Sequence, residues 1–514
     1  MNIRPIAEDD IEQVIQLFRL NYGDDYAIPE FYDPQWVKRG IYSDHIIWMV
    51  IEDDDPAGGP GKRIVASGAA ILDFGDYNDQ IAEIGRLVVD PRVGGKGLGR
   101  QMLYALVDAS DDRVEFAFGE ARTTHVKTQH IFDRVGLVPL GFLPMAYRIQ
   151  WRESWVLSGQ LFNNGRVLRQ PETIQLIPEA APIATLALRN LELDTTFTVR
   201  DDIRPYPLDQ ALTIEPISGA SMIRLLKIEQ GRLFDPEVFG GLHIDQGISQ
   251  LQSHKASYLV ATDGGDTLGA VGYMPDKASH NVRIVELIGR DDAVKGCLLR
   301  KAVEEAERVH EAEFIDCDVS AHNPRIQRTL LDLGFLPAGY APGMVFHNTA
   351  RWDVVRMVKL NMAWDLGQVL LTESGQAMFD VVAPAFIRQS EQRMRQQSAR
   401  AAAAFRCLSP LEMDFVQRAG SLLDLSAGDS LSLDGLFVVL RGSVRCGERI
   451  IPVGDSLGAG ALIQRSPSQP VTAMEDASLF SLSLSTFDSL CRQHPHLGIT
   501  LYRCLAEQIP AETL

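Results

Sequence analysis

The strongest constraint on the fold is a weak internal repeat. The sequence Gly-Leu-Val-Pro at 136–139 returns as Gly-Phe-Leu-Pro at 334–337, and Gln129 and Gln327 share this offset of 198 residues. The start Ile-Arg-Pro-Ile at 3–6 similarly resembles Ile-Glu-Pro-Ile at 214–217. Because the two matches occur in the same order, we predict two copies of one domain, at 1–150 and 213–370.

Each copy has the alternating helix and strand patterns of a mixed α/β domain. In the first copy, apolar residues recur with helical spacing over 8–20, whereas 46–51, 64–73 and 81–89 read as strands. The expected elements that follow are a glycine-rich loop at 94–99, a helix at 98–109, a strand at 113–118, a helix at 125–134 and a strand at 140–150. We therefore predict the α+β class, with two tandem mixed-sheet domains.

The rest of the chain divides by composition. Residues 151–212 form a connecting segment, and residues 371–405 read as a helical linker. From about residue 406 to 514, short β-rich runs are punctuated by glycine and are followed by a final helical stretch. This pattern is typical of a β-roll or small barrel with flanking helices.

Charge and composition exclude several functions. The chain has 49 basic and 68 acidic residues, a net charge of −19, which disfavours nucleic-acid binding and suits a cationic amine. No run of about 20 apolar residues is present, and the N-terminus lacks an apolar signal core. We therefore expect a cytoplasmic protein without membrane contact. The six cysteines form no CxxC pair, so we expect no metal site.

The strongest chemical motif is a glycine-rich turn between a strand and a helix. Pro91 follows the strand at 81–89, and glycines at 94, 95, 97 and 99 open the helix. Glycine allows backbone N–H groups to approach an anion, and the helix N-terminus adds about half a positive charge, so the turn suits a pyrophosphate. Because Lys96 is followed by glycine, the turn does not fit the P-loop of nucleotide triphosphatases.

With strand, turn and helix in this order, residues 1–150 resemble the GNAT acyltransferase family. The family's acyl-CoA motif, Arg or Gln, two residues, Gly, one residue, Gly or Ala, aligns with 94–99, where a glycine replaces the leading Arg or Gln. The resemblance implies acetyl-CoA or a longer acyl-CoA as donor, with Arg92 or Arg100 supplying the missing charge. The implied donor-binding residues are Leu87, Val88, Val89, Gly94, Gly95, Lys96, Gly97, Leu98, Gly99 and Arg100.

The same resemblance assigns candidate catalytic residues. Glu83 stands where the family often places its general base, and His125 replaces an asparagine of the family's later motif. The family's tyrosine, which protonates the departing thiolate, is replaced by Phe132; Tyr104, Tyr147 and His125 are the remaining candidates for that role. The predicted catalytic set is Glu83, His125 and Tyr147.

The resemblance also suggests an acceptor region and an inactive second copy. The segment 21–40 carries Asp24, Asp25, Glu30 and Asp33, which either hold a cationic amine or form a solvated loop. The second copy retains Asn323 and the pair Gly334-Phe335, but it lacks the glycine turn. Because Asp291 and Asp292 at the matching place would repel a pyrophosphate, we predict a non-catalytic GNAT-like domain there.

The C-terminal region resembles the cyclic-nucleotide-binding fold. The resemblance rests on Ala-Gly-Asp at 427–429, the run Phe437–Gly442 and Gly-Asp at 454–455. Nucleotide-binding members carry Gly-Glu and then an arginine for the cyclic phosphate. Here Gly458 is followed by alanine, and the arginine position falls near Pro467 or Ser468, with Arg465 out of register. We expect a regulatory or oligomerisation module that binds no cyclic nucleotide.

Two classes of function follow from these observations. The first is an acyl-CoA-dependent N-acyltransferase that transfers an acetyl or longer acyl group directly to a primary amine of a protein, peptide or small molecule. An acyl carrier protein is the alternative donor, and a homo-oligomer is a candidate assembly. The second is a non-catalytic acyl-CoA-sensing or scaffolding protein. A DNA-binding regulator fits neither the charge nor the absence of a helix-turn-helix pattern after the β-roll.

Overall fold

The computed structural model divides the chain into two compact units, Met1–Phe386 and Ile387–Leu514. It describes residues 1–24, 29–59, 61–74, 79–93, 95–149, 151–217, 237–240, 256–362, 364, 369–400, 403–432, 434–464 and 470–506.

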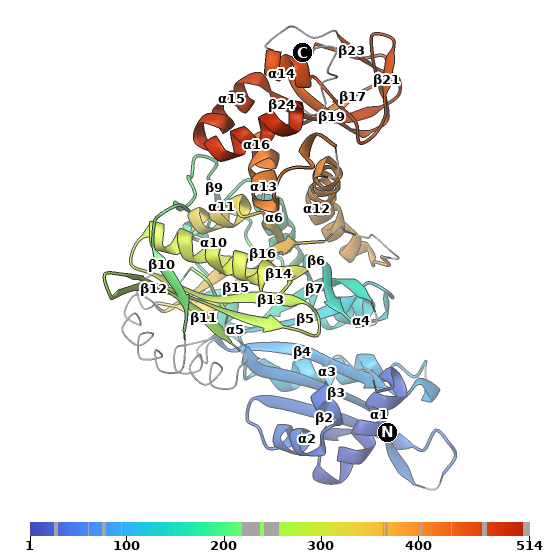
Figure 1. Ribbon diagram of the computed structural model, residues 1–514. Coiled ribbons are helices and arrows are strands. Elements are labelled where there is room, and N and C mark those ends of the chain that lie inside the picture. Colours follow the sequence, from blue (N-terminus) through green and yellow to red (C-terminus); the bar gives the residue numbers. More distant parts are fainter. Residues whose placement is uncertain are drawn as a thin grey trace. The chain divides into compact units, whose positions relative to one another are not determined.

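The first unit is built on one sheet of fourteen strands, in which a first half and a second half meet edge to edge (Figure 1). The first-half strands are β1 (Asn2–Pro5), β2 (Ile46–Asp54), β3 (Lys62–Phe74), β4 (Ile81–Val89), β5 (Phe116–Arg122), β6 (Val138–Arg148) and β7 (Arg152–Leu161). The second-half strands are β10 (Thr213–Pro216), β11 (Ser257–Asp263), β12 (Asp266–Asp276), β13 (Asn281–Gly289), β14 (Phe314–Ser320), β15 (Leu336–His347) and β16 (Ala350–Leu360).

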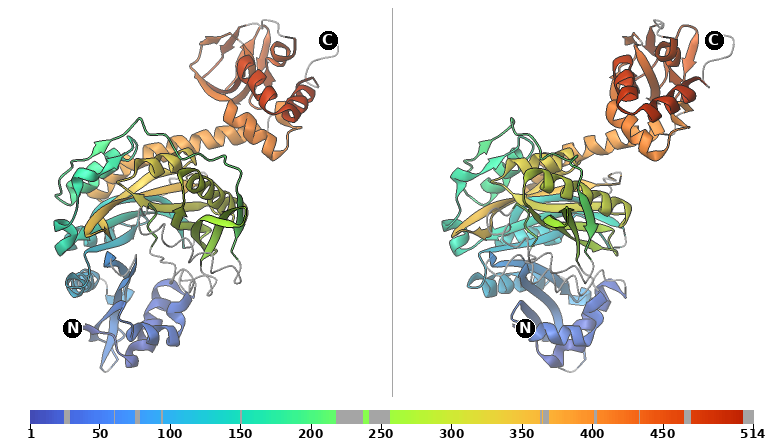
Figure 2. Two further views of the ribbon diagram at one scale, coloured as in Figure 1. Left: turned by 90° about the vertical axis from the view of Figure 1, so that its left-hand side faces the viewer. Right: turned by 60° about the vertical axis from the view of Figure 1, so that its left-hand side comes forward.

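The strand order has pseudo-twofold symmetry. It runs β1-β2-β3-β4-β5-β7-β6 in the first half and continues as β15-β16-β14-β13-β12-β11-β10, which is the same order in reverse. The halves join where Gly141 of β6 faces Gly339 of β15 in an antiparallel bridge, and these two glycines are 198 residues apart. The inner strands of both halves accordingly lie side by side in Figure 2. The mixed sheet confirms the predicted α+β class.

The first half extends beyond the boundary predicted at residue 150. β7 lies between β5 and β6, pairs antiparallel with both, and runs to Leu161. The β6–β7 ladder shifts register twice, between Pro139/Gly141 and between Leu143/Tyr147, which obscures the two-residue alternation expected of a strand. The polar start Arg-Glu-Ser at 152–154 hides the strand further, so the sequence pattern indicated a connecting segment.

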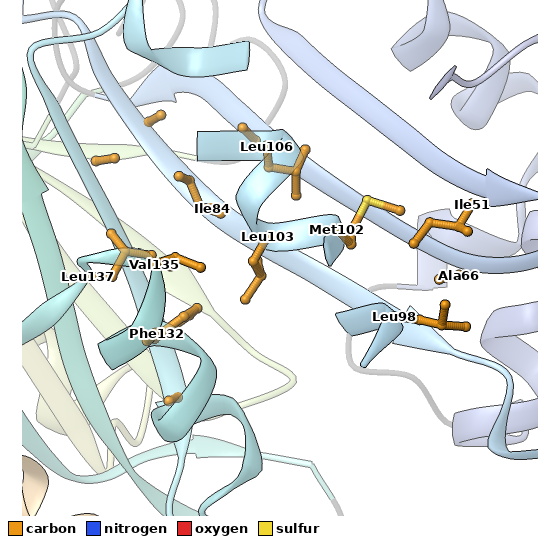
Figure 3. Close-up of a cluster of buried hydrophobic side chains, with 14 of the residues drawn as sticks. Ile51, Ala66, Ile84, Leu98, Met102, Leu103, Leu106, Phe132, Val135 and Leu137 are labelled. Atoms are coloured by element: carbon orange, nitrogen blue, oxygen red, sulfur yellow. The ribbon is translucent and has the colours of Figure 1, made fainter. Parts of the chain in front are cut away.

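Helices cover the sheet of the first half and supply its core. They are α1 (Ile11–Tyr22), α2 (Pro34–Ile41), α3 (Leu98–Asp111) and α4 (Lys127–Val135). Leu98, Met102 and Leu106 recur at four-residue spacing on α3, so they share one face, and they are buried in one cluster with residues of β3 and β4 (Figure 3). This packing fixes the start of α3 relative to the strands that it follows.

The segments after β16 and after β7 are each held by one glutamine, Gln129 and Gln327, that bonds two backbone groups. Gln129 donates to the carbonyl of Leu370 and accepts from the amide of Thr372, at 2.9 and 3.0 Å. Gln327 donates to the carbonyl of Gln175 and accepts from the amide of Ile177, at 3.1 and 3.2 Å. The repeat thus includes the segment after its last strand. After β7 come α5 (Asn163–Val167), β8 (Gln175–Leu176), α6 (Ala181–Asn190) and β9 (Thr198–Val199), and after β16 comes α12 (Glu373–Arg400). Two further helices of the second half, α10 (Asp292–Arg308) and α11 (Pro324–Asp332), follow β13 and β14, respectively.

The second unit contains two four-stranded sheets, ordered β17-β24-β19-β22 and β18-β23-β20-β21. Its strands are β17 (Ser421–Leu425), β18 (Ser430–Leu431), β19 (Gly435–Arg441), β20 (Val444–Cys446), β21 (Arg449–Ile451), β22 (Ser456–Leu457), β23 (Val471–Ala473) and β24 (Ala477–Ser483). Its helices are α13 (Pro410–Ala419), α14 (Ala459–Gln464), α15 (Leu484–Gln493) and α16 (Pro495–Ala506). One apolar cluster lies between the two sheets, and a second joins the sheet of β19 and β24 to the helices. This arrangement agrees with the predicted β-roll with flanking helices. The expected cyclic-phosphate positions Pro467 and Ser468 lie outside the described residues.

Candidate active site

The site begins where two parallel strands separate. β4 and β5 pair only over Ile81–Glu83 and Phe116–Phe118, although within the described residues β4 continues to Val89 and β5 to Arg122. Arg86 has a φ of 53°, and the β3–β4 register shifts at this point, which marks a bulge in β4. The three predicted donor-binding residues Leu87, Val88 and Val89 follow directly after the bulge.

The glycine-rich turn lies beyond β4 and is open to solvent. Gly95 has a φ of 86° and Gly97 a φ of 70°, conformations that favour glycine. A Cβ atom placed on Gly95 would meet nothing within 4 Å, and one on Gly97 would meet only Arg100 Nη2 at 3.9 Å. Gly97 caps α3 without a side-chain hydrogen bond, so the first N–H groups of the helix remain available to an anion. Gly94 lies outside the described residues.

The remaining residues of the turn divide by role. Leu98 is buried in the core, and a Cβ on Gly99 would contact Leu87 Cδ2 at 3.4 Å, so these two positions seat the helix. Lys96 pairs with Asp53 at 3.1 Å. Of the two arginines considered for the missing charge, Arg92 pairs with Asp90 at 2.6 Å, whereas Arg100 is exposed in the first turn of α3. We therefore favour Arg100 for a donor phosphate.

Glu83 lies on β4 at the last residue before the strands separate. Its side chain is 12% exposed and forms two hydrogen bonds with Arg86, at 2.7 and 2.9 Å. Since the bulge turns Arg86 back towards Glu83, the carboxylate is held by its own strand. The predicted base is therefore placed at the strand gap, but already bound to a guanidinium group.

The structure adds a second carboxylate, Glu120, which the sequence pattern did not reveal. It lies on β5 and is 10% exposed. Burial raises the pKa of Glu120, and Arg356 and a hydrogen bond from Tyr147 oppose that rise. Glu83 contributes to the same pKa shift, so the two carboxylates interact. One signal was available: Asp318, 198 residues later, places a carboxylate at the same position of β14.

Tyr147 lies on β6 beside these carboxylates. Burial raises the pKa of its phenol well above the usual value of 10, and Glu120 adds to the rise. Its ring packs edge-on against Trp155, with 5.0 Å between ring centroids. Tyr147 therefore keeps its proton and donates a hydrogen bond to Glu120, and its role as proton donor stays a prediction.

The other two candidates for proton donation lie in different surroundings. Tyr104 is exposed on α3 and donates its hydroxyl to the carbonyl of Arg134 at 2.7 Å. His125 is half-buried before α4; burial, together with Arg122, lowers its pKa, and its Nδ1 has no hydrogen-bond partner among the described residues. Phe132 is buried in the core under Gly119 and cannot donate a proton. No described contact joins His125 or Tyr104 to Glu83.

The acidic residues of segment 21–40 have local roles. Asp33 caps α2 by accepting from the amide of Gln35 at 2.9 Å. Asp24 is 89% exposed and lies 3.5 Å from Arg19. Glu30 is exposed, and Asp25 lies outside the described residues. These contacts favour the solvated-loop interpretation of this segment.

The equivalent region of the second half is closed by the chain itself. β13 and β14 also separate, after Ile284 and Cys317, but here residues 237–240 enter the gap. Phe239 donates to the carbonyl of Asp318 at 2.9 Å, and a Cβ on Gly240 would lie 2.2 Å from Val285 Cα. Asp291 accepts from the amide of Val294 in the first turn of α10 at 3.0 Å, where an anion would bind. These features oppose donor binding in the second copy, for which the sequence predicts a non-catalytic domain, with a degenerate but still-binding domain as the less favoured alternative.

The described residues contain neither a metal site nor a membrane-spanning helix. In the described part of the chain, no group of three or more His, Cys, Asp or Glu residues is arranged to hold a metal ion. Among the same residues, no helix is long and apolar enough to cross a membrane.

Comparisons with known proteins identify the first half. Residues 11–136 match the model of the acetyltransferase (GNAT) family, which confirms the resemblance seen in the glycine-rich turn. No curated protein matches the chain.

Three of the solved structures that match parts of this chain are as follows. A mutant of the spermidine N-acetyltransferase SpeG from Vibrio cholerae is 17% identical over 31% of this chain and 92% of its own, with a TM-score of 0.26. A ribosomal-protein alanine N-acetyltransferase from Escherichia coli is 16% identical over 32% and 94%, with a TM-score of 0.25. The regulatory domain of Toxoplasma gondii PKA with cAMP is 21% identical over 20% and 44%, with a TM-score of 0.18.

Proposed function

We propose that the first half of this chain, whose residues 11–136 belong to the acetyltransferase (GNAT) family, is an acyl-CoA-dependent N-acyltransferase. The observation that carries the proposal is the open turn at Gly95–Gly97, before the uncapped N-terminus of α3 and beyond the bulge of β4. The turn suits the pyrophosphate of CoA because, among the described residues, only Arg100 comes within 4 Å of the Cβ positions of Gly95 and Gly97. The pantetheine would follow the backbone of Leu87–Val89 on the side where β4 no longer pairs with β5.

The proposed reaction is direct transfer to a primary amine. The acceptor ammonium first loses a proton to a carboxylate, either Glu83 as the sequence predicts or Glu120. The neutral nitrogen then attacks the thioester carbonyl carbon, so that a C–N bond forms and the C–S bond breaks. The thiolate takes a proton from Tyr147, which recovers one from Glu120 through their hydrogen bond where Glu120 is the base, and from solvent where Glu83 is the base. The nitrogen, which is cationic after the attack, gives its second proton to the same carboxylate or to solvent, so that one proton is released per amide formed. Placing the donor and base in one site removes most of the entropic cost of their encounter.

The alternative is a protein that binds acyl-CoA without turnover. The bidentate pairing of Glu83 with Arg86 favours it, because both carboxylate oxygens of Glu83 already accept a hydrogen bond from Arg86 and the acceptor ammonium would have to displace one of these bonds. The presence of Glu120 and Tyr147 beside Glu83 favours the enzyme. Both hypotheses predict one donor per chain, since residues 237–240 fill the second gap.

A substitution that copies the second half tests the donor site. Gly97→Asp places a carboxylate at the start of α3, as Asp291 does at the start of α10, and should weaken acetyl-CoA binding at least tenfold through repulsion of the pyrophosphate. Gly97→Asn is the matched control, because it has the same shape without the charge and should retain more affinity. The measurement is calorimetric titration of the full chain with acetyl-CoA, longer acyl-CoAs, free CoA and cAMP.

Each result has a definite meaning. Binding of one acyl-CoA per chain that is lost in Gly97→Asp supports the site, and the preferred donor indicates the acyl length. Turnover of a primary amine separates the enzyme from the acyl-CoA sensor. Equal affinities of the Asp and Asn variants would place the donor elsewhere. Binding of cAMP would overturn the expectation for the C-terminal unit, which we propose is a regulatory or oligomerisation module.

A further inference from the structure

A buried ion pair connects the two halves at the proposed active site. Arg356 of β16 points one guanidinium nitrogen, Nη1, at Glu120 Oε1 of β5, at 3.3 Å. The two residues are 236 positions apart in the chain, and their side chains are 7% and 10% exposed. A charge so far from water is retained at considerable cost, so its placement beside Glu120 calls for an explanation.

The orientation of Arg356 is fixed from the far side. Its Nε and Nη2 each donate to the carboxylate of Asp318 at 2.7 Å, in the planar two-point geometry that arginine favours. Arg283 donates to the same carboxylate at 2.7 Å. Because these bonds hold the plane of the guanidinium group, Nη1 can point only along the direction that leads to Glu120.

The groups around Glu120 come from four strands. Arg356 and Arg283 approach from β16 and β13 of the second half, and Tyr147 and Glu83 from β6 and β4 of the first. The two halves also enclose a small cavity beside the pair, lined by Phe116, Phe118, Leu157, Asp318, Tyr340 and Arg356. The surroundings of Glu120 are therefore a product of both halves.

We propose that Arg356 of the second half is a positioning residue that holds Glu120 of the first half in its proton-accepting place at the acceptor amine. The inference rests on the proposed acyl transfer and assigns the second half a part in it. Arg356 stabilises the carboxylate form of Glu120, and its fixed geometry orients the carboxylate. Without Arg356, Glu120 would be protonated more readily in its buried surroundings.

The test uses the full chain and measures kcat/KM against pH. The probes are acetyl-CoA with spermidine, a lysine-containing peptide or a peptide with N-terminal alanine, and the amine that reacts fastest is used throughout. In Arg356→Gln we expect the acidic limb of the profile to move upward by about one to three pH units, as for loss of an adjacent opposite charge. In Arg356→Lys, which retains the positive charge, the acidic limb should stay close to its wild-type position.

A matched control separates positioning from folding. Arg169→Lys alters another buried arginine, which binds Asp353 at 2.7 Å, and should leave the pH profile in place. A double-mutant cycle with Glu120→Gln adds a second criterion: if Arg356 acts through Glu120, Arg356→Lys should change kcat/KM little once Glu120 is removed. Additive effects, or a profile that does not move, would overturn the inference.

A measurement without an acceptor distinguishes this inference from the proposed function. Carbon-13 NMR of the glutamate carboxyl groups, with Glu120→Gln to assign the signal, reports the titration of Glu120 in the resting protein. We expect its midpoint to rise in Arg356→Gln and to stay in Arg169→Lys. If Arg356→Gln does not fold, the same comparison is made with Arg356→Lys, where a smaller rise is expected and an unchanged midpoint refutes the pairing. If the midpoint rises but no amine is acylated, the acyltransferase proposal fails while the pairing stands.

Discussion

The junction of the two halves offers a sharp test, because its two facing glycines are equivalent by symmetry but not by surroundings. A Cβ on Gly141 would lie 2.6 Å from both the carbonyl oxygen of Ala338 and the Cα of Gly339. A Cβ on Gly339 would meet the flexible end of Leu157 at 3.2 Å and Gly141 Cα at 3.5 Å. Gly141→Ala must therefore move backbone, whereas Gly339→Ala needs only a small side-chain adjustment.

The expected free energies follow from these contacts. Overpacking against backbone costs about 1–3 kcal/mol. Alanine in place of glycine also restricts the unfolded chain, which stabilises the folded state by about 0.4–1 kcal/mol where the native backbone permits it. Neither glycine has a positive φ, so this gain applies at both positions. Gly141→Ala should thus lower the free energy of unfolding by about 1–2 kcal/mol, and Gly339→Ala should leave it within about 0.5 kcal/mol.

Urea unfolding followed by tryptophan fluorescence is the suitable assay. All six tryptophans, at positions 36, 48, 151, 155, 352 and 364, belong to the first unit, so the fluorescence signal reports on that unit alone. A lower midpoint with an unchanged slope for Gly141→Ala reports lost stability rather than a changed unfolded state. Equal midpoints for the two variants, or a greater loss in Gly339→Ala, would refute this description of the junction.

Three further predictions use the same chain. Arg92 lowers the pKa of Asp90, so the stability that this pair contributes is present at neutral pH and is lost as the pH falls through that lowered pKa. Urea unfolding should therefore show Asp90→Asn to be less stable than wild type at pH 7, and the free energies of unfolding of the two proteins should become equal at strongly acidic pH. Gln129→Ala and Gln327→Ala should each cost about 1–3 kcal/mol by leaving buried backbone groups unpaired; tryptophan fluorescence in urea measures both, and a loss at only one of them would contradict the shared role. Burial raises the pKa of the Cys317 thiol, so it should react with a thiol reagent only on unfolding; mass spectrometry of the labelled native protein would disprove this by finding rapid modification there.

Much of the fold could be predicted from short-range patterns. The offset of 198 residues between two short matches predicted two copies, and the structure places residues with that same offset opposite each other at Gly141 and Gly339. What escaped was the strand β7, because register shifts and a polar start break its alternation. Local sequence can signal a strand only where the pattern of buried residues is regular.

In the candidate site, too, the features set by local sequence were predictable and those set by tertiary contacts were not. The glycine-rich turn was predictable because Gly95 and Gly97 meet local needs, a positive φ and open space before the helix. Glu83 was placed correctly on its strand, but its pairing with Arg86 depends on a bulge that the sequence does not announce. Glu120 was missed because its importance arises from Arg356, which reaches it only after both halves have folded.

Joining both copies in one chain changes what the junction has to accomplish. Two separate subunits would have to find each other at cellular concentration and pay the entropic cost of association, whereas covalent linkage supplies a high effective concentration. An interface that includes a charged pair such as Arg356 and Glu120 need not hold by affinity alone. In a symmetric dimer every substitution occurs in both subunits. In a single chain the two copies can differ in sequence. One copy could then close its own gap with residues 237–240 while the other kept its gap open.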